Sequence, residues 1–377
     1  MSAIPESDLV SLLCELIEVD SPTGKEAAVA RLISSRMTGA GFDRVHVDEN
    51  GNVVGEVRSA VPGKKLLLLT HSDCSPVPPE LLPPRAEVLH GEKFGKKGKV
   101  VAGPGAAAPK GAIAAMIMAG RALAAGRDRW AGCFAVAVVT KDLLANHDGP
   151  REVAQLVRDA SLALTAEPSQ NNVVVAARGI LHLRVTVRGR TGHWGVPDPD
   201  GNSIYRAGAF LARLRDIPPT AHPDFGPTGF NPIDLAIRSS PPRLPEWVSV
   251  TVDRRVLPGE SVREIVETVE GLARDAAGGD AEVTVLRRMY PFQADGVEVE
   301  SEMLRDVVVN ALGREPRRIT VKFGSNAAFL KNELGIPSMV LGPGSIDDLG
   351  PTEHVEIEQV LAAAAIYRDF ALRYLGS

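Results

Sequence analysis

The chain has few cysteines, no excess of positive charge and no long apolar run. Its three cysteines, Cys14, Cys74 and Cys133, are odd in number and far apart, which argues against a disulfide framework and is typical of a reducing cytoplasm. A net charge of -5 argues against nucleic acid as a partner. No apolar run reaches about 18 residues, and acids interrupt the N-terminal apolar positions, so neither a membrane span nor a signal peptide is expected. We therefore expect a cytoplasmic protein with a small-molecule partner.

Length and composition indicate a globular chain of two domains. The 377 residues exceed what one ordinary core accommodates, and no internal repeat or low-complexity segment divides them differently. A hydrophobic content of 44% and a charged content of 24% are those of a folded globular protein.

The stretch LLLLTHSDCSP, residues 66–76, is the most informative part of the sequence. Its apolar run is too short for a helix and predicts a buried strand. His71 and Asp73 follow at the carboxyl end, where α/β sheets gather their ligands. Alternation points both side chains the same way, so Asp73 can accept from one ring nitrogen and leave the other for a metal, a substrate or a proton. A histidine that is merely hydrogen-bonded at a strand end explains this motif equally well.

Two further predicted strands also end in acids. CFAVAVVT, residues 133–140, leads to Asp142, and LALT, from residue 162, leads to Glu167. Both runs have the length and β-branched content of buried strands, so we expect these acids and His71 at one rim of one sheet. The other elements expected in this half are helices opening near residues 8, 25, 111 and 152, a hairpin over 45–57, and a loop with a short ribbon over 77–102.

The pattern changes after Ala177. A long alternating segment begins at residue 179, and further alternating strands are expected at 247–255 and 282–288, with helices over about 202–214 and 261–276. Helix and strand alternation resumes after Asp295. We therefore predict a discontinuous α/β catalytic domain, residues 1–178 and 291–377, in which a mixed, mostly parallel sheet lies between two helical layers. Residues 179–290 form an inserted α+β lid.

These motifs, in this order, resemble those of the dinuclear-zinc peptidase family that includes acetylornithine deacetylase, succinyl-diaminopimelate desuccinylase, carboxypeptidase G and aminoacylase. The resemblance makes His71 the counterpart of a zinc ligand, with Asp73 as its orienting acid. TAEPS makes Glu167 a second ligand of the same zinc, and LGPGSIDDLGPTEHVEIE makes His354 a ligand of the other zinc.

The resemblance also implies a homodimer and a small substrate, an amino-acid derivative with a carboxylate. RGRTGHWG is similar to the segment whose histidine, here His193, reaches the active site of a partner subunit, and Arg255 stands at the position associated with substrate carboxylates. A guanidinium suits that task because its donors form a fixed fork. The remaining substrate-binding residues that the resemblance implies are Lys110, Asn202, Ser325, Asn326, Gly342 and Gly344.

The chain departs from the family at positions that matter for metal binding. Ala108 stands where the family has the aspartate that bridges both zincs, and Leu143 and Leu144 replace the general base and a zinc ligand. Zinc sites need three or four protein donors. We therefore expect no cofactor, or at most one weakly bound zinc, with His71, Glu167 and His354 as vestigial ligands.

Two functions remain open from the sequence. In the first, the chain is a metal-independent enzyme that makes, transfers or breaks an acyl or amide bond, with the His71–Asp73 dyad as general base and Glu167 and His354 in the same catalytic set. In the second, it is an inactive relative that binds a ligand or a partner. Several ionisable residues in one cleft favour the enzyme. Cys74 is more typical of a small buried hydrophobe than of a nucleophile.

Overall fold

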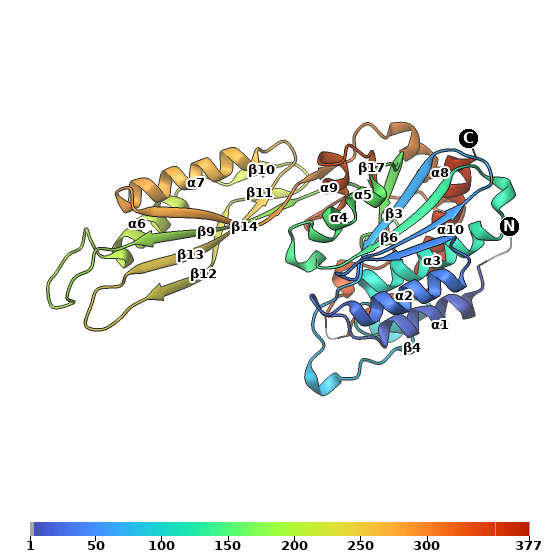
Figure 1. Cartoon of the computed structure of the whole chain (residues 1–377), viewed down its shortest axis with the longest axis horizontal. Coiled ribbons are helices and arrows are strands. Elements are labelled where there is room, and N and C mark those ends of the chain that lie inside the picture. The colour runs from blue at the N-terminus through green and yellow to red at the C-terminus, as the bar shows by residue number, and fades with distance from the viewer. Residues whose placement is uncertain (1–3, 351, 377) are drawn as a thin grey trace. The chain divides into compact units, whose positions relative to one another are not determined.

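The computed structural model describes residues 4–350 and 352–376 (Figure 1). Residues 1–3 and 377, at the ends of the predicted catalytic domain, and Pro351 in the closing motif lie outside the described residues. The chain divides into two compact units. Unit 1 holds the described residues within Met1–Val175, Gln293–Ile319 and Ser325–Ser377, and unit 2 holds Ala176–Phe292 and Thr320–Gly324. That these units are a catalytic domain and a lid stays a prediction.

Unit 1 is built on a mixed sheet with a parallel centre. In spatial order its strands include β1 (Arg44–Val47), β2 (Val53–Arg58), β6 (Cys133–Val139), β3 (Lys65–His71), β7 (Leu162–Thr165), β17 (Ser338–Val340) and β8 (Val173–Ala177). From β6 to β17 neighbouring strands are parallel, whereas β1, β2 and β8 pair antiparallel with their neighbours. The short strands β15 (Phe292–Gln293) and β16 (Arg318–Val321) adjoin β8.

Helices cover both faces of this sheet because the side chains of its central strands alternate between two cores. Leu66 and Leu68 of β3 face one core and Leu67 and Leu69 the other, and all four are fully buried. The first core is shared with α1 (Glu6–Ile17), α2 (Ala27–Gly39), α3 (Gly111–Ala124), α8 (Glu298–Leu312) and α10 (Ile357–Leu375). The second is shared with α5 (Ala154–Val157) and α9 (Ala327–Asn332), beside α4 (Asp148–Glu152). The predicted three-layer fold is confirmed.

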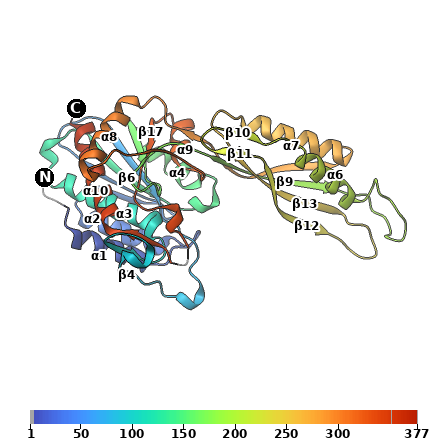
Figure 2. The same cartoon turned by 180° about the vertical axis from the view of Figure 1, so that it is seen from behind.

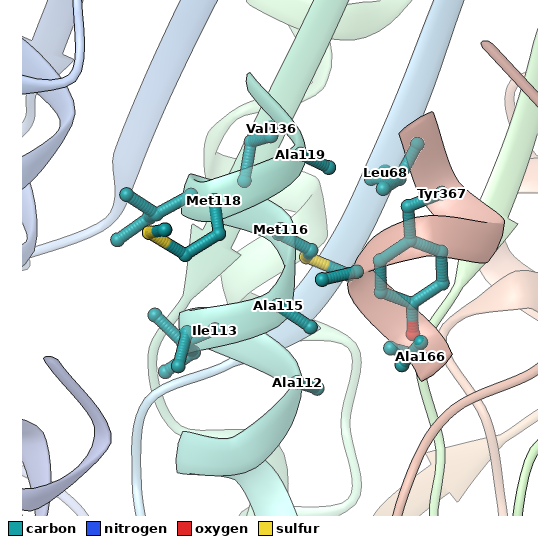
Figure 3. Packing of buried hydrophobic residues seen from close by; sticks show 14 of the residues in the cluster. Leu68, Ala112, Ile113, Ala115, Met116, Met118, Ala119, Val136, Ala166 and Tyr367 are labelled. Carbon is teal, nitrogen blue, oxygen red and sulfur yellow. The ribbon is translucent and has the colours of Figure 1, made fainter. Parts of the chain in front are cut away.

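Small residues let α3 lie close to its neighbours. Figure 3 shows Ala112, Ala115 and Ala119 on α3 beside Met116, with Leu68 of β3 and Tyr367 of α10 packed nearby. Helix α10 lies between α3 and α8 (Figure 2). The buried Tyr367 hydroxyl donates to the carbonyl oxygen of Leu341 at 3.1 Å, so the one polar atom that this side chain buries is satisfied.

The short ribbon expected within residues 77–102 is present and forms part of a second small sheet. Its strands are β4 (Glu87–His90), β5 (Lys99–Ala102) and β18 (His354–Glu356), and β5 pairs with both of the others. This pairing brings the closing motif beside residues 99–102, although more than 250 residues separate the two in sequence. Short helical turns of unit 1 are η1 (Pro79–Leu81), η2 (Gly91–Phe94), η3 (Ala106–Lys110), η4 (Arg127–Arg129), η5 (Asp142–Leu144) and η6 (Ile346–Asp348).

Unit 2 is an antiparallel sheet with helices on one face. Its strands lie in the order β12 (Phe230–Arg238), β13 (Trp247–Val256), β9 (Gly179–Arg188) and β14 (Ala281–Met289). The buried side chains of β9 and β13 share one core with α6 (Ser203–Arg215) and α7 (Val262–Ala277). A ribbon of β10 (Thr220–His222) and β11 (Gly226–Thr228) completes the unit. Strand β12 escaped the sequence prediction because Pro232 interrupts it, and an edge strand tolerates a proline.

One local expectation for unit 1 is wrong. The helix expected to open near residue 152 is divided into α4 and α5 at Val153. Helix α1 begins at Glu6, close to the predicted start, and has no side-chain cap. None of the helices within residues 4–350 and 352–376 is long and apolar enough to cross a membrane.

The ring of Phe42 leaves no space for a side chain at Gly120 in α3, because a Cβ added there would lie 2.3 Å from the ring. We expect Gly120→Ala to destabilise unit 1 by about 1–3 kcal/mol through overpacking. Gly39, at the end of α2, has open space around it, so Gly39→Ala is the matched control and should be neutral or stabilising by up to about 1 kcal/mol. Urea unfolding followed by circular dichroism measures both, and equal midpoints would contradict the packing described here.

Candidate functional site

Three neighbouring parallel strands of unit 1 end at the same edge of the sheet. The register pairs His71 at the end of β3 with Val139 at the end of β6, and Leu69 with Thr165 at the end of β7. The chain then turns over this edge, so that His71, Asp142 and Glu167 interact with one another electrostatically. The predicted convergence of three strand ends on one rim is confirmed.

Asp73 is fully buried and holds the loops of the rim together. Its carboxylate accepts hydrogen bonds from His71 Nδ1 at 3.1 Å and from the Thr23 hydroxyl at 2.8 Å. It also accepts from the backbone N–H groups of Asp142 at 3.0 Å and Leu143 at 3.1 Å. The predicted His71–Asp73 pair is present, and the same acid fixes the start of the loop that carries Asp142.

The other ring nitrogen of His71 faces two acids. Its Nε2 lies 3.9 Å from Oδ2 of Asp142, which is too long for a direct hydrogen bond. Oδ1 of Asp142 accepts from Asn326 Nδ2 at 2.6 Å. Glu167 lies close enough to interact with both charges and is hydrogen-bonded to the Ser325 side chain. One oxygen of Asp142 is therefore held by the protein and the other faces His71.

Burial and mutual charge shift the protonation of this group. Burial alone lowers the pKa of His71, but the charge of Asp142 and the hydrogen bond to Asp73 outweigh it and raise the pKa to about 10. Burial and the neighbouring charge of Asp142 raise the pKa of Glu167 to about 8. Burial also raises the pKa of Asp142, whereas the charge of His71 and the hydrogen bond from Asn326 favour its carboxylate form. At neutral pH the rim therefore holds an imidazolium, a protonated Glu167 and the carboxylate of Asp73, which His71 keeps at a pKa of about 2 against the effect of burial.

Ala108 lies in a loop that the side chain of Glu353 holds in place. The carboxylate of Glu353 accepts from the backbone N–H groups of Gly105 at 2.9 Å, Ala107 at 3.0 Å and Ala108 at 3.2 Å. Burial raises the pKa of Glu353. Lys110 is fully buried, and its ammonium donates to the carbonyl oxygen of Val19 at 2.9 Å. Lys110 thus has a structural partner of its own.

His354 lies on β18 in a pocket of aromatic and acidic neighbours. Its Nδ1 donates to the carbonyl oxygen of Thr352 at 2.9 Å, and Phe94 stacks on the ring with centroids 4.1 Å apart. Among the described residues its buried Nε2 has no hydrogen-bond partner, and the nearest carboxylate oxygen, of Asp348, is 3.6 Å away. Asp348 itself pairs with Lys96 at 2.8 Å.

The predicted glycines have a backbone role in this structure. A Cβ on Gly342 would lie 2.5 Å from the carbonyl oxygen of Glu167, and a Cβ on Gly344, at φ +79°, would lie 2.2 Å from that of Ala107. These close approaches admit only glycine. Leu143 is exposed at 45% and Leu144 is half-buried. Cys74 is buried, with its sulfur 3.5 Å from the Ser21 hydroxyl.

Three of the predicted residues lie in unit 2. His193 is exposed, and its Nδ1 accepts from the backbone N–H of Gly195 at 3.1 Å. Asn202 is the N-cap of α6, where its side chain accepts from the backbone N–H of Ile204 at 2.9 Å. Arg255 is half-exposed on β13 and pairs with Asp253 at 3.2 Å.

His147 lies near the rim, although the sequence offers only weak grounds to expect it there and it is not among the predicted site residues. It is 2% exposed, and its Nδ1 lies 2.9 Å from Oδ1 of Asn326. Its separation from Asp142 by five residues offered no helical or strand periodicity to relate the two, because the intervening loop is irregular. Only the contact with Asn326, 179 residues away in sequence, links His147 to the site.

The fold and the acid-rich rim define an α/β protein with a polar site at the carboxyl ends of its parallel strands, and this chain is similar to known proteins over nearly its whole length. Residues 175–281 match the peptidase dimerisation domain of the M20 family. Succinyl-diaminopimelate desuccinylase of Xanthomonas oryzae pv. oryzae is 27% identical, covering 98% of this chain and 99% of that protein. Acetylornithine deacetylase of Myxococcus xanthus is 26% identical, covering 98% of each.

Solved structures agree in fold. A tripeptidase of Staphylococcus aureus superposes with a TM-score of 0.78 at 20% identity, covering 98% of this chain and 99% of that one. A dinuclear metal-binding peptidase of the M20 family from Bacillus subtilis gives a TM-score of 0.70 at 14% identity, covering 98% of each chain. The chain thus has the fold of M20 peptidases, and residues 175–281 match the dimerisation domain of that family.

The similarity corrects the expectation about cofactors. The sequence predicts none, or at most one weakly bound zinc, yet a solved M20 relative is a dinuclear metal-binding peptidase, so that expectation is wrong. The expectation rests on the missing donors at Ala108, Leu143 and Leu144. A metal can also be held by donors from other parts of a fold, and Asp142, whose carboxylate lies beside His71, is a further donor.

The described residues do not form a complete metal site. Across residues 4–350 and 352–376, no three or more His, Cys, Asp or Glu side chains are arranged to hold an ion. Nε2 of His71 and Oδ2 of Asp142 are one pair of donor atoms 3.9 Å apart, and Nε2 of His354 lies 3.6 Å from Asp348. A zinc site needs three or four donors, which this arrangement does not supply.

The raised pKa of Glu167 predicts a pH-dependent contribution to stability. Between the ordinary value of 4.5 and the folded value of about 8, the folded chain binds a proton that the unfolded chain has lost, so the free energy of unfolding falls as pH rises. Glu167→Gln removes this term. Relative to the parent, the variant should gain stability between pH 5 and pH 8, by about 1 kcal/mol or more.

Urea unfolding at both pH values measures this difference. The exposed Glu49 provides the control, because water solvates its side chain in both states and Glu49→Gln should change the midpoint equally at each pH. A Glu167→Gln variant whose stability relative to the parent is the same at pH 5 and pH 8 would show that Glu167 is not held protonated.

Proposed function

We propose that this chain hydrolyses the amide bond of a small N-acyl amino acid. The relatives named above are a desuccinylase and a deacetylase, each named for removing an acyl group from an amino acid. The observation that carries the proposal is the rim itself, where an imidazolium, a carboxylate with one free oxygen and a protonated acid interact in a buried space. These are the groups that amide hydrolysis needs.

In the first step Asp142 acts as the base. A water that contacts Oδ2 of Asp142 can bridge the 3.9 Å to His71 Nε2. Asp142 takes a proton from this water as its oxygen attacks the acyl carbon. The carbonyl oxygen becomes an oxyanion, which the positive charge and N–H of His71 stabilise. The sequence-based assignment of His71 as the base does not suit this arrangement, because a cationic imidazole has no lone pair with which to accept a proton.

In the second step the carbon–nitrogen bond breaks. The departing nitrogen takes the proton of Glu167, which burial and the charge of Asp142 keep protonated at neutral pH, and the carbonyl re-forms as the oxyanion collapses. The products are a free amine and a carboxylic acid. Asp142 and Glu167 thus have opposite roles, as two acids in different environments often do.

Unit 2 carries a cluster of positive charge that supports a substrate with a carboxylate. Arg255 pairs with Asp253, and the neighbouring Arg254 pairs with Glu260 at 2.6 Å. Arg178 donates to the carbonyl oxygen of Phe225. Burial and then the charges of Arg255 and Arg254 lower its pKa. Three guanidinium groups beside these two acids leave a surplus positive charge, which a substrate carboxylate neutralises.

Unit 2 also supports a homodimer. Its sequence matches a dimerisation domain, and β12 forms one edge of its sheet. Leu235 and Ile237 of β12, exposed at 51% and 47%, pair across from the buried Val250 and Val248 of β13. They therefore extend the apolar, helix-covered face of the sheet to its edge. A second copy pairing along β12 would bury these side chains, and the exposed His193 is the residue we assign to contact the partner. The cytoplasmic location stays a prediction.

If Asp142 is the general base, its substitution should have a large effect on kcat. Asp142→Asn should lower kcat for N-succinyl or N-acetyl amino acids by about 10²-fold or more, because general-base catalysis contributes that much. Asp148→Asn, on the same loop at a partly exposed side chain that pairs with Arg151, should leave kcat unchanged. Release of free amine is measured for both variants and the parent, with and without added Zn²⁺. A parent that binds such compounds without cleaving them would support the alternative of an inactive, ligand-binding relative.

If the dimer forms through β12, substitutions at the two edges of the sheet should differ in their effect on dimerisation. Leu235→Lys combined with Ile237→Lys should convert the dimer to a monomer, because two charges would be buried at the interface. Val285→Lys lies on β14 at the opposite edge, where Val285 is exposed at 44%, and should leave the dimer intact. Light scattering gives the mass of each variant, and an unchanged mass for the β12 variant would exclude this edge as the interface.

A further inference from the structure

The loop after β6 is held in an unusual conformation beside the site. Lys141, Ala145 and His147 have φ values of 60°, 57° and 56°, a region that residues other than glycine enter at a cost of about 1–3 kcal/mol each. Such a conformation persists only where surrounding contacts determine it. Glu26 accepts from the backbone N–H of Lys141 at the start of this loop. Asp73 binds the next residues, and Asn326 contacts the loop at both Asp142 and His147.

The contacts of Asn326 have a definite direction. Its Nδ2 donates to Oδ1 of Asp142 at 2.6 Å, so its Oδ1 is turned toward Nδ1 of His147 at 2.9 Å. An amide oxygen is an acceptor, which requires that His147 carry its proton on Nδ1. If the amide turned over, its oxygen would face a carboxylate oxygen of Asp142 and its NH₂ would face the N–H of His147. His147 therefore selects the orientation in which Asn326 can bind Asp142.

The ring of His147 is itself fixed. It is 2% exposed and lies against Phe329 of α9 with ring centroids 5.7 Å apart. The guanidinium of Arg151 lies over the same phenyl ring, 5.3 Å from the centroid of Phe329. A buried ring packed in this way cannot rotate to present its other nitrogen without disturbing α9.

We propose that His147 and Asn326 are positioning residues that aim Oδ2 of Asp142 at His71 and the reacting water. Oδ1 of Asp142 is bound to Asn326 and Oδ2 is directed at His71 Nε2. This inference rests on the proposed function, because it supplies the alignment that makes Asp142 an effective base. The chain His147–Asn326–Asp142 extends the site from the sheet rim to α9.

Substitutions at His147 test the inference. His147→Leu removes the donor and should lower kcat by about 10- to 100-fold with little change in KM, because a misdirected base slows the chemical step more than substrate binding. His147→Asn should restore most of the rate, since an asparagine amide can place a donor where Nδ1 lies and asparagine tolerates a positive φ. Asn326→Asp, which sets a carboxylate against Asp142, should lose at least as much kcat as His147→Leu.

Two controls make the outcome specific. Urea unfolding of each variant shows whether it folds, and ¹⁵N-histidine NMR of the parent should show a signal with a proton on Nδ1 that disappears in His147→Asn. If Asp142→Asn abolishes turnover but His147→Leu does not alter kcat, the positioning role fails and the proposed function stands. If the parent cleaves no N-acyl amino acid, the proposed function fails, and with it the catalytic meaning of this chain of contacts, even where the NMR signal is found. A histidine bearing no proton on Nδ1 would overturn the inference directly.

Discussion

The buried carboxylate of Asp73 is the group on which the rest of the site depends. It accepts hydrogen bonds from the ring of His71, from the hydroxyl of Thr23 and from two backbone N–H groups of the loop that begins at Asp142. A buried charge is tolerated only when such partners satisfy it, because removing one partner leaves a cost of several kcal/mol. One side chain at the end of β3 thereby joins an N-terminal loop, the central strand and the loop after β6 in a single arrangement.

The same rim is an acidic environment with one internal cation. Asp73 lies beside one ring nitrogen of His71 and Asp142 beside the other. Glu167 interacts electrostatically with both Asp142 and the imidazole. The repulsion between these negative charges is reduced because His71 and Glu167 each keep a proton. The protonation states that serve acid–base chemistry are therefore a consequence of how the acids are packed, and the same negative charges would favour any further cation that entered the space.

The sheet of unit 2 has an apolar edge. It has one face covered by α6 and α7 and one edge, β12, whose apolar side chains continue that covered face without a strand beyond them. An edge of this kind is a natural place for a second chain to pair. The positive cluster around Arg255 lies in the same unit, near the end of β13 that pairs with the start of β9.

The sequence by itself determined the layered fold and the location of the rim. Short buried runs followed by His71, Asp142 and Glu167 sufficed, because side-chain alternation and the parallel direction of strands are local rules that place strand ends together. The motifs also indicated the similarity to M20 peptidases. They did not reveal the cofactor chemistry, since the absence of donors at Ala108, Leu143 and Leu144 says nothing of donors elsewhere in space.

Only the tertiary structure decided which groups share a charge environment. The protonation of His71 and Glu167 depends on burial and on distances between side chains from three strands, which no spacing in the sequence encodes. Glu353 contacts the loop at Ala108, and His147 contacts Asn326. The residues of each pair are about 180 to 250 positions apart in the sequence. Such contacts form when separate elements pack, so the local pattern determined where the site lies and long-range packing determined what its side chains are able to do.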